Sequence, residues 1–494
     1  MRIPLDRDGG TPLYQQIERH LREQILSGGL PAETRLPATR QLATDLGVSR
    51  ITVKNAYAAL ESDGLIGSRE GSGTFVMPAA QRQPPAGGAG RLWPLWQLPF
   101  AAEEEERDVP PAQPSAHPQP IAFTGVGDPR EFPVKDLLKA MQQVVRRDGA
   151  AALEYGGFDH GYAPLRQTVT QVLASQGIQA HPDRVLITAG SQQGLALVCQ
   201  TLLRPGDTVV VESPTYNLAL ELFRAQGLRA VGVPIDQDGM RTDALEPLLQ
   251  EGPRLIYTIP NFQNPSGACL SAPRRRQLLA LAQRYDVPIL EDDFVGDLRY
   301  QGRALPAIKA LDPGGQVIYT GSFAKMLMPG LRVGYLLAEG PVFGRLVRQK
   351  RVSDLTTSTL MQRALDVFVT VGRYQAHLRR SCRLYGRRRD AMLAAVRRHL
   401  PAGVEHSPPQ GGLFLWLRLP AGLSAGELLP LAAEEGVLFA PGGRFFPDPA
   451  EGERFLRLNF AVQTPADIDE GVRRLGIALR RLGARRGGSK GAAV

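Results

Sequence analysis

Three side chains with complementary chemistry occur close together in residues 320–335 of the sequence. They are Ser322, Lys325 and Arg332. A lysine amine can form a Schiff base with an aldehyde, while a hydroxyl and a guanidinium can hold a phosphate dianion. A lone lysine after Gly-Ser is usually a surface residue, so this interpretation depends on finding further partners elsewhere in the chain.

The elements expected around these residues would place a ligand at strand ends. A short buried strand predicted over 317–320 delivers Lys325 at its carboxyl end, where ligands bind in α/β sheets. A β-branched strand predicted over 185–188 precedes Ser191 and Gln192 at the start of an apolar helix. The free N–H groups and positive dipole end of such a helix start favour phosphate, although Ser191 could also be an ordinary N-cap.

Two more predicted strands end in polar or aromatic residues. The strand over 208–211 leads to Tyr216, whose ring could lie against a flat ligand or belong to the core. The strand over 287–290 ends in three consecutive acids, of which Asp292 is the second. Asn264 lies in a segment that, as Asn-Pro followed by Gly, would by itself indicate only a turn.

In order and spacing, these motifs resemble the lysine signature and cofactor contacts of fold-type I pyridoxal phosphate (PLP) enzymes. The resemblance implies that Lys325 forms the Schiff base with PLP and that Asn264 binds the phenolic oxygen. It places Asp292 opposite the pyridine nitrogen, where a carboxylate favours the protonated ring that acts as an electron sink. Lys325 and Asp292 are then the catalytic pair. The implied cofactor-binding residues are Tyr155, Ser191, Gln192, Tyr216, Asn264, Asp292, Ser322, Lys325 and Arg332.

The same resemblance assigns two residues outside the cofactor signature and reveals one departure. Tyr155 resembles the tyrosine that reaches the phosphate across a dimer interface. Arg457 matches the arginine that binds an amino acid's α-carboxylate, although an arginine on a strand edge is usually solvated. Phe294 and Val295 stand where relatives carry a tyrosine bonded to the phenolic oxygen. That oxygen is left to Asn264 unless another tyrosine substitutes, which puts efficient proton transfer in transamination in question.

Residues 11–77 carry a different pattern, of helices followed by a wing. Helical apolar spacing and glycine turns predict helices over 14–26, 36–47 and 48–60, and a wing from 65–66 to 74–76 that turns at 71–73. The pattern resembles the winged helix-turn-helix of the GntR superfamily of bacterial regulators.

That resemblance implies double-stranded operator DNA as a partner. Arg50 and Thr52 would face bases, and Arg40, Ser49 and Lys54 would face phosphates. A three-helix packing domain with a few surface cations is the alternative.

Charge does not exclude this alternative. Residues 1–78 contain nine Lys/Arg and nine Asp/Glu, so the net charge of +9 is carried elsewhere. Much of the excess lies in 387–389 and 473–490, which we expect to be solvated helix faces.

A length of 494 residues predicts two to four domains. We predict a winged helix-turn-helix (α+β) over 1–78, a Pro/Ala-rich linker over 79–119, and an α/β fold-type I aminotransferase-like domain over 120–484. The last comprises a large α/β/α part with a mostly parallel sheet and a smaller C-terminal α+β part. A basic flexible tail is predicted over 485–494. The linker segment Leu92–Trp96, with Trp93, is expected to pack on a domain surface.

Together the two halves resemble the MocR subgroup of GntR regulators. This implies a homodimeric, PLP-dependent transcription regulator that senses PLP or a small amino compound. An active aminotransferase carrying a DNA-binding module is the first alternative. The second is an enzyme whose first 78 residues only aid assembly.

Compartment signals point to a bacterial cytoplasmic protein. No apolar run is long enough to span a membrane, and residues 1–10 lack a signal-peptide core. Cys199, Cys269 and Cys382 lie far apart, with neither metal-ligand spacing nor a disulfide framework. We therefore expect no metal and no membrane partner.

Overall fold

The computed structural model describes residues 3–6, 12–69, 73–78, 117–156, 160–323, 325 and 327–489. The chain divides into two compact units, residues 1–110 and 111–494. The division falls inside the predicted linker. Most of that linker, including Leu92–Trp96, lies outside the described residues.

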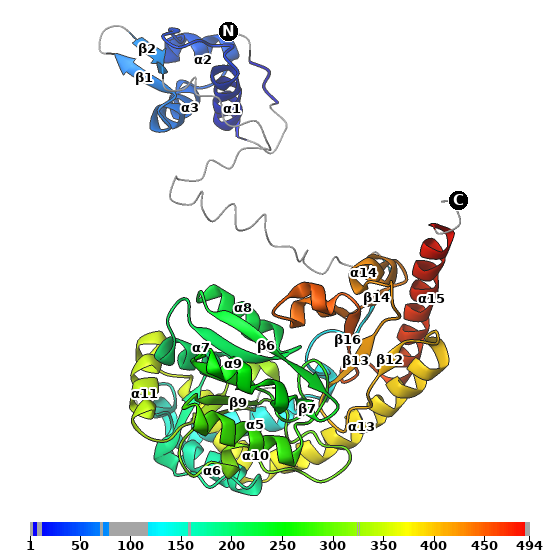
Figure 1. Cartoon of the computed structure of the whole chain (residues 1–494). Coiled ribbons are helices and arrows are strands. Elements are labelled where there is room, and N and C mark those ends of the chain that lie inside the picture. The colour runs from blue at the N-terminus through cyan, green and yellow to red at the C-terminus, as the bar shows by residue number, and fades with distance from the viewer. Residues whose placement is uncertain are drawn as a thin grey trace. The chain divides into compact units, whose positions relative to one another are not determined.

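Within its described residues, the first unit shows three helices and a two-stranded wing (Figure 1). Its elements are α1 (Leu13–Leu26), α2 (Thr39–Leu46), α3 (Arg50–Ser62), β1 (Ile66–Arg69) and β2 (Gly73–Val76). Helical spacing on α1 buries Ile17, Leu21 and Ile25 in one apolar core. The predicted helix-turn-helix and its antiparallel wing are therefore present, and the predicted turn at 71–73 lies mostly outside the described residues.

Two helices of this unit begin later than predicted, for identifiable reasons. The helix predicted from Leu36 begins at Thr39, because Leu36 precedes a proline and its N–H donates to the Thr74 carbonyl oxygen at 2.9 Å. The recognition helix begins at Arg50 rather than Val48. Here the Ser49 side chain is the N-cap and accepts from the Thr52 N–H at 3.1 Å.

An eight-stranded sheet forms the centre of the second unit. In spatial order its strands are β4 (Val185–Thr188), β11 (Gly334–Leu337), β10 (Val317–Ser322), β9 (Ile289–Asp293), β8 (Leu255–Thr258), β5 (Thr208–Ser213), β6 (Arg229–Asp236) and β7 (Gly239–Met240). Pairing is parallel from β10 to β6, and β11 and β7 run antiparallel to their neighbours. The predicted mostly parallel sheet is confirmed.

Helices cover both faces of this sheet (Figure 1). They are α5 (Val134–Asp148), α6 (Ala163–Ser175), α7 (Ser191–Leu202), α8 (Asn217–Ala225), α9 (Glu246–Gln250), α10 (Ala272–Arg284), α11 (Pro341–Asp354) and α12 (Thr359–Thr370). Successive strand residues point to opposite faces, so Val209 and Val211 join one apolar cluster and Val210 joins another. This is the α/β/α layering expected from alternating strands and helices.

The long helix α13 (Arg373–His399) leads to the smaller C-terminal part (Figure 1, yellow to red). Its antiparallel sheet has the order β12 (Glu405–His406), β13 (Phe414–Arg418), β16 (Phe455–Asn459) and β15 (Ala440–Pro441). This part also contains α14 (Ala425–Glu434), the 3-10 turns η9 (Gly442–Phe445) and η10 (Pro449–Gly452), α15 (Pro465–Ser489), and β14 (Val437–Leu438) paired in parallel with β3 (Ile121–Ala122). Of the predicted basic tail over 485–494, residues 485–489 belong to α15, and residues 490–494 lie outside the described residues.

Two strand boundaries differ from prediction in a way that matters for the site. β9 begins at Ile289 because Pro288 has no N–H for the ladder, and it continues through Asp293. β10 continues through Ser322, beyond the predicted end at Thr320. Asp292 and Ser322 are therefore held in the sheet, and the residue opposite Asp292 on β10 is Thr320.

The expectation that residues 387–389 form a solvated face is wrong for two of them. Arg388 is 3% exposed, and its Nη2 donates to the buried Asp128 carboxylate at 2.7 Å. Arg389 is also buried and donates from Nη1 to the Pro409 carbonyl oxygen at 3.1 Å. These cations tie α13 to distant segments, because a buried guanidinium requires acceptors.

Candidate functional site

Lys325 follows the carboxyl end of β10 and is partly buried. Burial lowers the pKa of its amine, and the charge of Arg332 lowers it further, whereas Asp292 opposes the shift. A lysine with a depressed pKa has more of the neutral, nucleophilic form at ordinary pH. The environment thus favours the amine chemistry predicted for this residue.

Asp292 is a buried carboxylate of which one oxygen accepts a hydrogen bond and the other has no partner within the described residues. Its Oδ2 accepts a 2.9 Å hydrogen bond from the Tyr257 hydroxyl, while its Oδ1 has no hydrogen-bond partner within the described part of the chain. Burial raises the pKa of this carboxyl to about 7, although the bond from Tyr257 acts in the opposite direction. An unpartnered buried acceptor fits the protonated ring nitrogen of PLP.

Tyr257 was not predicted as a site residue from the sequence. It occurs in the apolar strand β8 and is fully buried. The available signal was that a buried phenol requires an acceptor, and β8 lies beside the acid-bearing strand β9. Tyr257 contacts Asp292 itself, whereas the tyrosine missing at 294 and 295 would have contacted the cofactor's phenolic oxygen.

Arg332 and the start of α7 meet at one end of the site. Arg332 adopts a left-handed φ of 51°, and its Nη2 donates to the Ala189 carbonyl oxygen at 2.7 Å. A Cβ on Gly190 would lie only 2.9 Å from that Nη2, and the positive φ of 90° at this position favours glycine. Gly190 is the N-cap of α7, so the interpretation of Ser191 as an ordinary N-cap is wrong.

Ser191 and Gln192 lie in the first turn of α7, where backbone N–H groups have no partner within the helix. The Gln192 side chain is already engaged, because its Nε2 donates to the Leu218 carbonyl oxygen at 3.2 Å. Anion binding at this residue would therefore use its backbone N–H. Ser322 lies at the end of β10, opposite Gly334 of β11.

Arg457 and Asn264 meet at the opposite side of the site. Arg457 donates from Nη1 to the Asn264 Oδ1 at 2.8 Å, and its guanidinium carbon lies 4.0 Å from the ring centroid of Phe414. Burial lowers the pKa of Arg457 to about 9, and the charge of Arg444 contributes. The idea of a solvated strand-edge arginine is wrong, because β16 lies between β13 and β15.

Tyr216 precedes α8 and shares this environment. Burial raises the pKa of its phenol to about 12, and the charges of Asp292, Arg457 and Arg332 also act on it. The structure therefore brings Tyr216, Asp292, Lys325, Arg332 and Arg457 into one electrostatic neighbourhood.

Glu212, at the end of β5, anchors the loop that carries Asn264. Its carboxylate accepts from the Thr258 hydroxyl at 2.7 Å and from Gln263 Nε2 at 3.1 Å. The Oε1 of Gln263 in turn accepts from the Ser266 N–H and hydroxyl at 3.0 and 2.7 Å. This network fixes the residues on either side of Asn264. Sequence reasoning missed it because its bonds join separate strands and loops.

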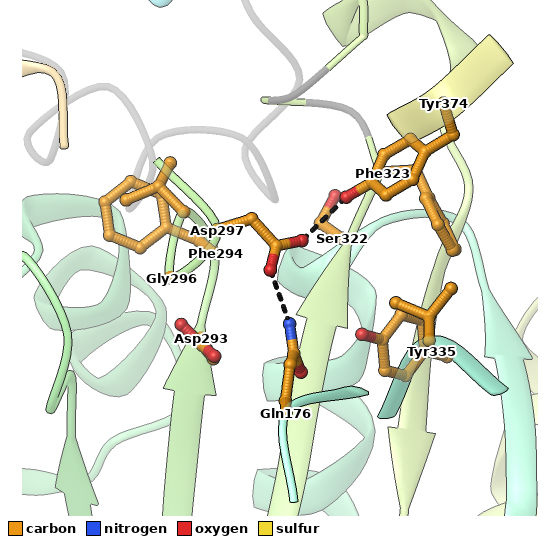
Figure 2. Close-up of a pocket in the computed structure, with 11 residues that line it drawn as sticks. Gln176, Asp293, Phe294, Gly296, Asp297, Ser322, Phe323, Tyr335 and Tyr374 are labelled. Carbon is orange, nitrogen blue, oxygen red and sulfur yellow. Dashed lines mark hydrogen bonds between the residues drawn. The ribbon is translucent and has the colours of Figure 1, made fainter. Parts of the chain in front are cut away.

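A small cavity of about 10 Å³ lies at the ends of β9 and β10 and is lined in part by Asp293 and Ser322 (Figure 2). Asp297 accepts from Gln176 Nε2 and from the Tyr374 hydroxyl, each at 2.8 Å. Asp293 also faces the cavity, and its Oδ1 has no partner within the described residues. The cavity has room for about one water molecule. The surrounding bonds stiffen the loop after β9 that packs beside Ser322.

Tyr155 is not brought into the site within one chain. Its side chain is 63% exposed, and residues 157–159 lie outside the described part. Nearby apolar side chains are also exposed, including Leu138 and Val145 on α5 and Leu153.

In the first unit, α2 and α3 carry exposed basic side chains. Arg40, Arg50 and Lys54 are exposed and form no ion pair within the described residues. Ser49 is occupied as the N-cap, and its hydroxyl lies 2.8 Å from the Thr52 hydroxyl. Sequence reasoning missed Ile51, which is 70% exposed beside Arg50, an unusual exposure for isoleucine.

No described helix is long and apolar enough to cross a membrane. Within the described residues no group of three or more His, Cys, Asp or Glu could hold a metal ion.

Comparison with known proteins defines the class of each unit. Residues 124–475 match the family of aminotransferases of class I and II, which is PLP-dependent, and residues 13–76 match the gntR family of bacterial regulatory proteins. The crystal structure of LysN, the alpha-aminoadipate aminotransferase of Thermus thermophilus, superposes with a TM-score of 0.70 at 39% identity, covering 74% of this chain and 93% of that one.

Several relatives match nearly the whole chain. The uncharacterized HTH-type transcriptional regulator YdcR of Escherichia coli is 37% identical, with 94% of this chain and 98% of YdcR covered. The probable rhizopine catabolism regulatory protein MocR of Rhizobium meliloti is 33% identical, with 97% and 96% covered. The chain belongs to the MocR type of GntR-family regulators, in which a DNA-binding domain is joined to an aminotransferase-like domain.

Proposed function

We propose that this regulator binds PLP through Lys325 and changes its affinity for operator DNA when PLP or an amino compound occupies the site. The observation that carries the proposal is the electrostatic neighbourhood of Lys325, Asp292, Arg332 and Arg457 in a chain that also contains a helix-turn-helix. A regulator acting on chromosomal DNA would work in the bacterial cytoplasm.

Each residue has a distinct proposed role. When bound, the cofactor supplies an aldehyde and an electron-withdrawing ring. The amine of Lys325, made less basic by burial, would hold the cofactor at its aldehyde. Oδ1 of Asp292, which has no partner within the described residues, would accept from the ring nitrogen, and the amide of Asn264 would donate to the phenolic oxygen. Tyr216 would lie against the ring. Ser191, Gln192, Ser322 and Arg332 would hold the phosphate.

Arg457 is the proposed site for a carboxylate of the amino compound. Its hydrogen bond to Asn264 leaves other N–H groups free, and its Nε has no partner within the described residues. Occupation of Arg457 would pull on Asn264 and Phe414, and so on the β13–β16 sheet. A ligand alters DNA affinity only if it favours one arrangement of the chain over another.

At the DNA, Arg50 and Thr52 are proposed to face bases, and Arg40, Ser49 and Lys54 to face phosphates. The hydroxyl contact between Ser49 and Thr52 leaves the Thr52 methyl group for a base contact. We propose a homodimer that presents two such helices to a two-fold operator. The exposure of Tyr155 and of apolar residues on α5 supports a partner at that surface.

A working aminotransferase is the second candidate. It is favoured by the depressed pKa of Lys325 together with the availability of Arg457 for a carboxylate. It is disfavoured by Phe294 and Val295, which supply no proton at the phenolic oxygen.

Borohydride trapping tests the cofactor part of the proposal. The purified full chain is incubated with PLP, reduced with borohydride and digested, and the modified peptide is identified by mass spectrometry. We expect a single reduced adduct on Lys325 and no visible band in Lys325→Ala. Lys309→Ala, which removes another largely buried lysine, serves as the control and should retain the adduct. A reducible adduct at one site in Lys325→Ala would contradict the assignment.

A further inference from the structure

Arg444 lies beside the site on the 3-10 turn η9, immediately before Phe445. The carbonyl oxygen of Phe445 accepts from the Thr215 N–H at 2.7 Å, which fixes the turn next to Tyr216. The ring centroid of Phe445 lies 4.8 Å from the guanidinium carbon of Arg457. Arg444 therefore directly precedes the aromatic residue whose ring packs on Arg457, the proposed carboxylate-binding arginine.

The positive charge of Arg444 has no counterion in the part of the chain that the structure describes. It forms no ion pair there, and its Nε is buried without a hydrogen-bond partner. Arg457 also has an unpartnered Nε, and within the described residues the one hydrogen bond of its side chain goes to the neutral amide of Asn264. Two like charges thus approach each other without a carboxylate, and burial makes such charges costly unless they are paired.

The charge of Arg444 also acts on Arg457. Burial is the main reason that its pKa falls to about 9, and the next cause is the charge of Arg444. Tyr216 acts in the opposite direction, and no described carboxylate is among the groups that act on Arg457. The other cations of the site have a nearby negative charge or hydrogen-bond acceptor. The charge of Asp292 acts on Lys325, and Arg332 donates to the Ala189 carbonyl oxygen just before α7.

We infer that Arg444 binds a second acidic group of the ligand, so that the site selects amino acids that carry a side-chain carboxylate. This inference rests on the proposed function, in which Arg457 binds the α-carboxylate. The two guanidiniums would each take one carboxylate of such a ligand, and each unpartnered Nε would gain an acceptor.

The surroundings of Arg444 suit the carbon chain between the two carboxylates. Trp416 and Phe445 pack edge to face with ring centroids 5.6 Å apart, and Trp416 stacks on Phe455 at 5.4 Å. These rings form an apolar wall next to two cations. A low-polarity wall strengthens a charge-assisted hydrogen bond relative to the same bond in water.

The test uses pairs of ligands that differ in one charge. The PLP-loaded full chain is titrated with L-glutamate and L-glutamine, and with L-2-aminoadipate and its side-chain amide. Binding is followed by calorimetry and by the visible absorbance of the bound cofactor. The wild type should prefer at least one acid over its amide by about tenfold or more, as expected for a hydrogen bond between charged groups.

Three variants test whether Arg444 causes the preference for acids over amides. Arg444→Gln should lose most of this preference. It should bind the amides within about twofold of wild type, which also shows that the variant is folded. Arg444→Lys should keep part of it because the charge remains. Arg229→Gln removes an exposed arginine of β6 that pairs with Glu251, and it should behave like wild type.

Two outcomes would overturn the inference. Only the second would also contradict the proposed function. If acids and amides bind equally to the wild type, or if Arg444→Gln keeps the full preference, Arg444 does not read a second carboxylate and the proposed function survives. If PLP binds but none of the four ligands does, this inference fails together with the proposed sensing of amino compounds.

Discussion

Tyr257 donates a 2.9 Å hydrogen bond to Oδ2 of Asp292 and leaves Oδ1 as the vacant acceptor. The two residues lie on the neighbouring strands β8 and β9 and are both buried. The bond fixes the orientation of the carboxylate and lowers its pKa against the effect of burial. Tyr257 therefore acts through Asp292, as a positioning residue for the ring nitrogen.

Replacing Tyr257 by phenylalanine should weaken PLP binding roughly tenfold, because a hydrogen bond to a charged carboxylate is lost. It should also raise the pKa of Asp292 and move the pH dependence of PLP affinity to higher pH. An absorbance titration with PLP at several pH values measures both effects. Tyr285→Phe is the control, since Tyr285 donates to the distant Glu246 at 2.9 Å. An unchanged affinity and pH profile in Tyr257→Phe would contradict the positioning role.

Asp292 should make the PLP-free protein less stable as pH rises. Its folded pKa of about 7 is above the ordinary value of 3.8, so between these values the folded state holds more protons than the unfolded state. Stability is therefore lost as pH rises through that window. Asp292→Asn should be more stable than wild type above pH ~7 by on the order of 1–3 kcal/mol, and nearly equal near pH ~4. Denaturant midpoints across pH check this sign. A difference that shrinks with rising pH would refute it.

The pattern of residues was sufficient to predict much of the fold. Apolar periodicity located α1, α3 and the strands β4, β5 and β10, because local spacing determines which face is buried. Site residues at strand ends were predictable for the same reason. Parallel strands bring their carboxyl ends to one edge, so Asp292 and Lys325 had to be near each other.

Contacts between residues far apart in sequence were not predictable in this way. Arg388 and Asp128 are 260 residues apart, and their buried pair exists only because α13 folds back over the start of the unit. Tyr257, Glu212 and Arg444 acquire their roles from neighbouring strands and loops. Their local sequence carries no periodic signal for these partners.

On DNA, Arg50→Ala should lower affinity for the operator by roughly 1–3 kcal/mol, the value of a good base contact, without changing PLP absorbance. Arg50 is exposed at the first turn of α3 and forms no ion pair within the described residues. Arg19→Ala removes an equal charge from α1 and serves as the control. Binding to operator and random duplexes is compared at one salt concentration. An equal loss on random DNA would place Arg50 at a phosphate.

A dimer contact through Tyr155 makes a further prediction. The PLP-loaded wild type should sediment as a dimer. Tyr155→Phe should stay dimeric but bind PLP about tenfold more weakly, because one hydrogen bond to the phosphate is lost. The exposed side chain of Tyr155 in a single chain is the reason to expect a partner there. A stable, PLP-loaded monomer in sedimentation would exclude this arrangement.

The central claim is that occupancy at Lys325 controls DNA binding, and a footprint of the promoter next to the protein's own gene tests it most directly. The full chain, as wild type and as Lys325→Ala, is titrated on that DNA with and without PLP and amino acids. We predict that PLP or an amino ligand changes the operator affinity of the wild type by about 1–3 kcal/mol and that Lys325→Ala does not respond. Identical DNA affinity of the wild type under all conditions would contradict the regulatory account and favour the aminotransferase.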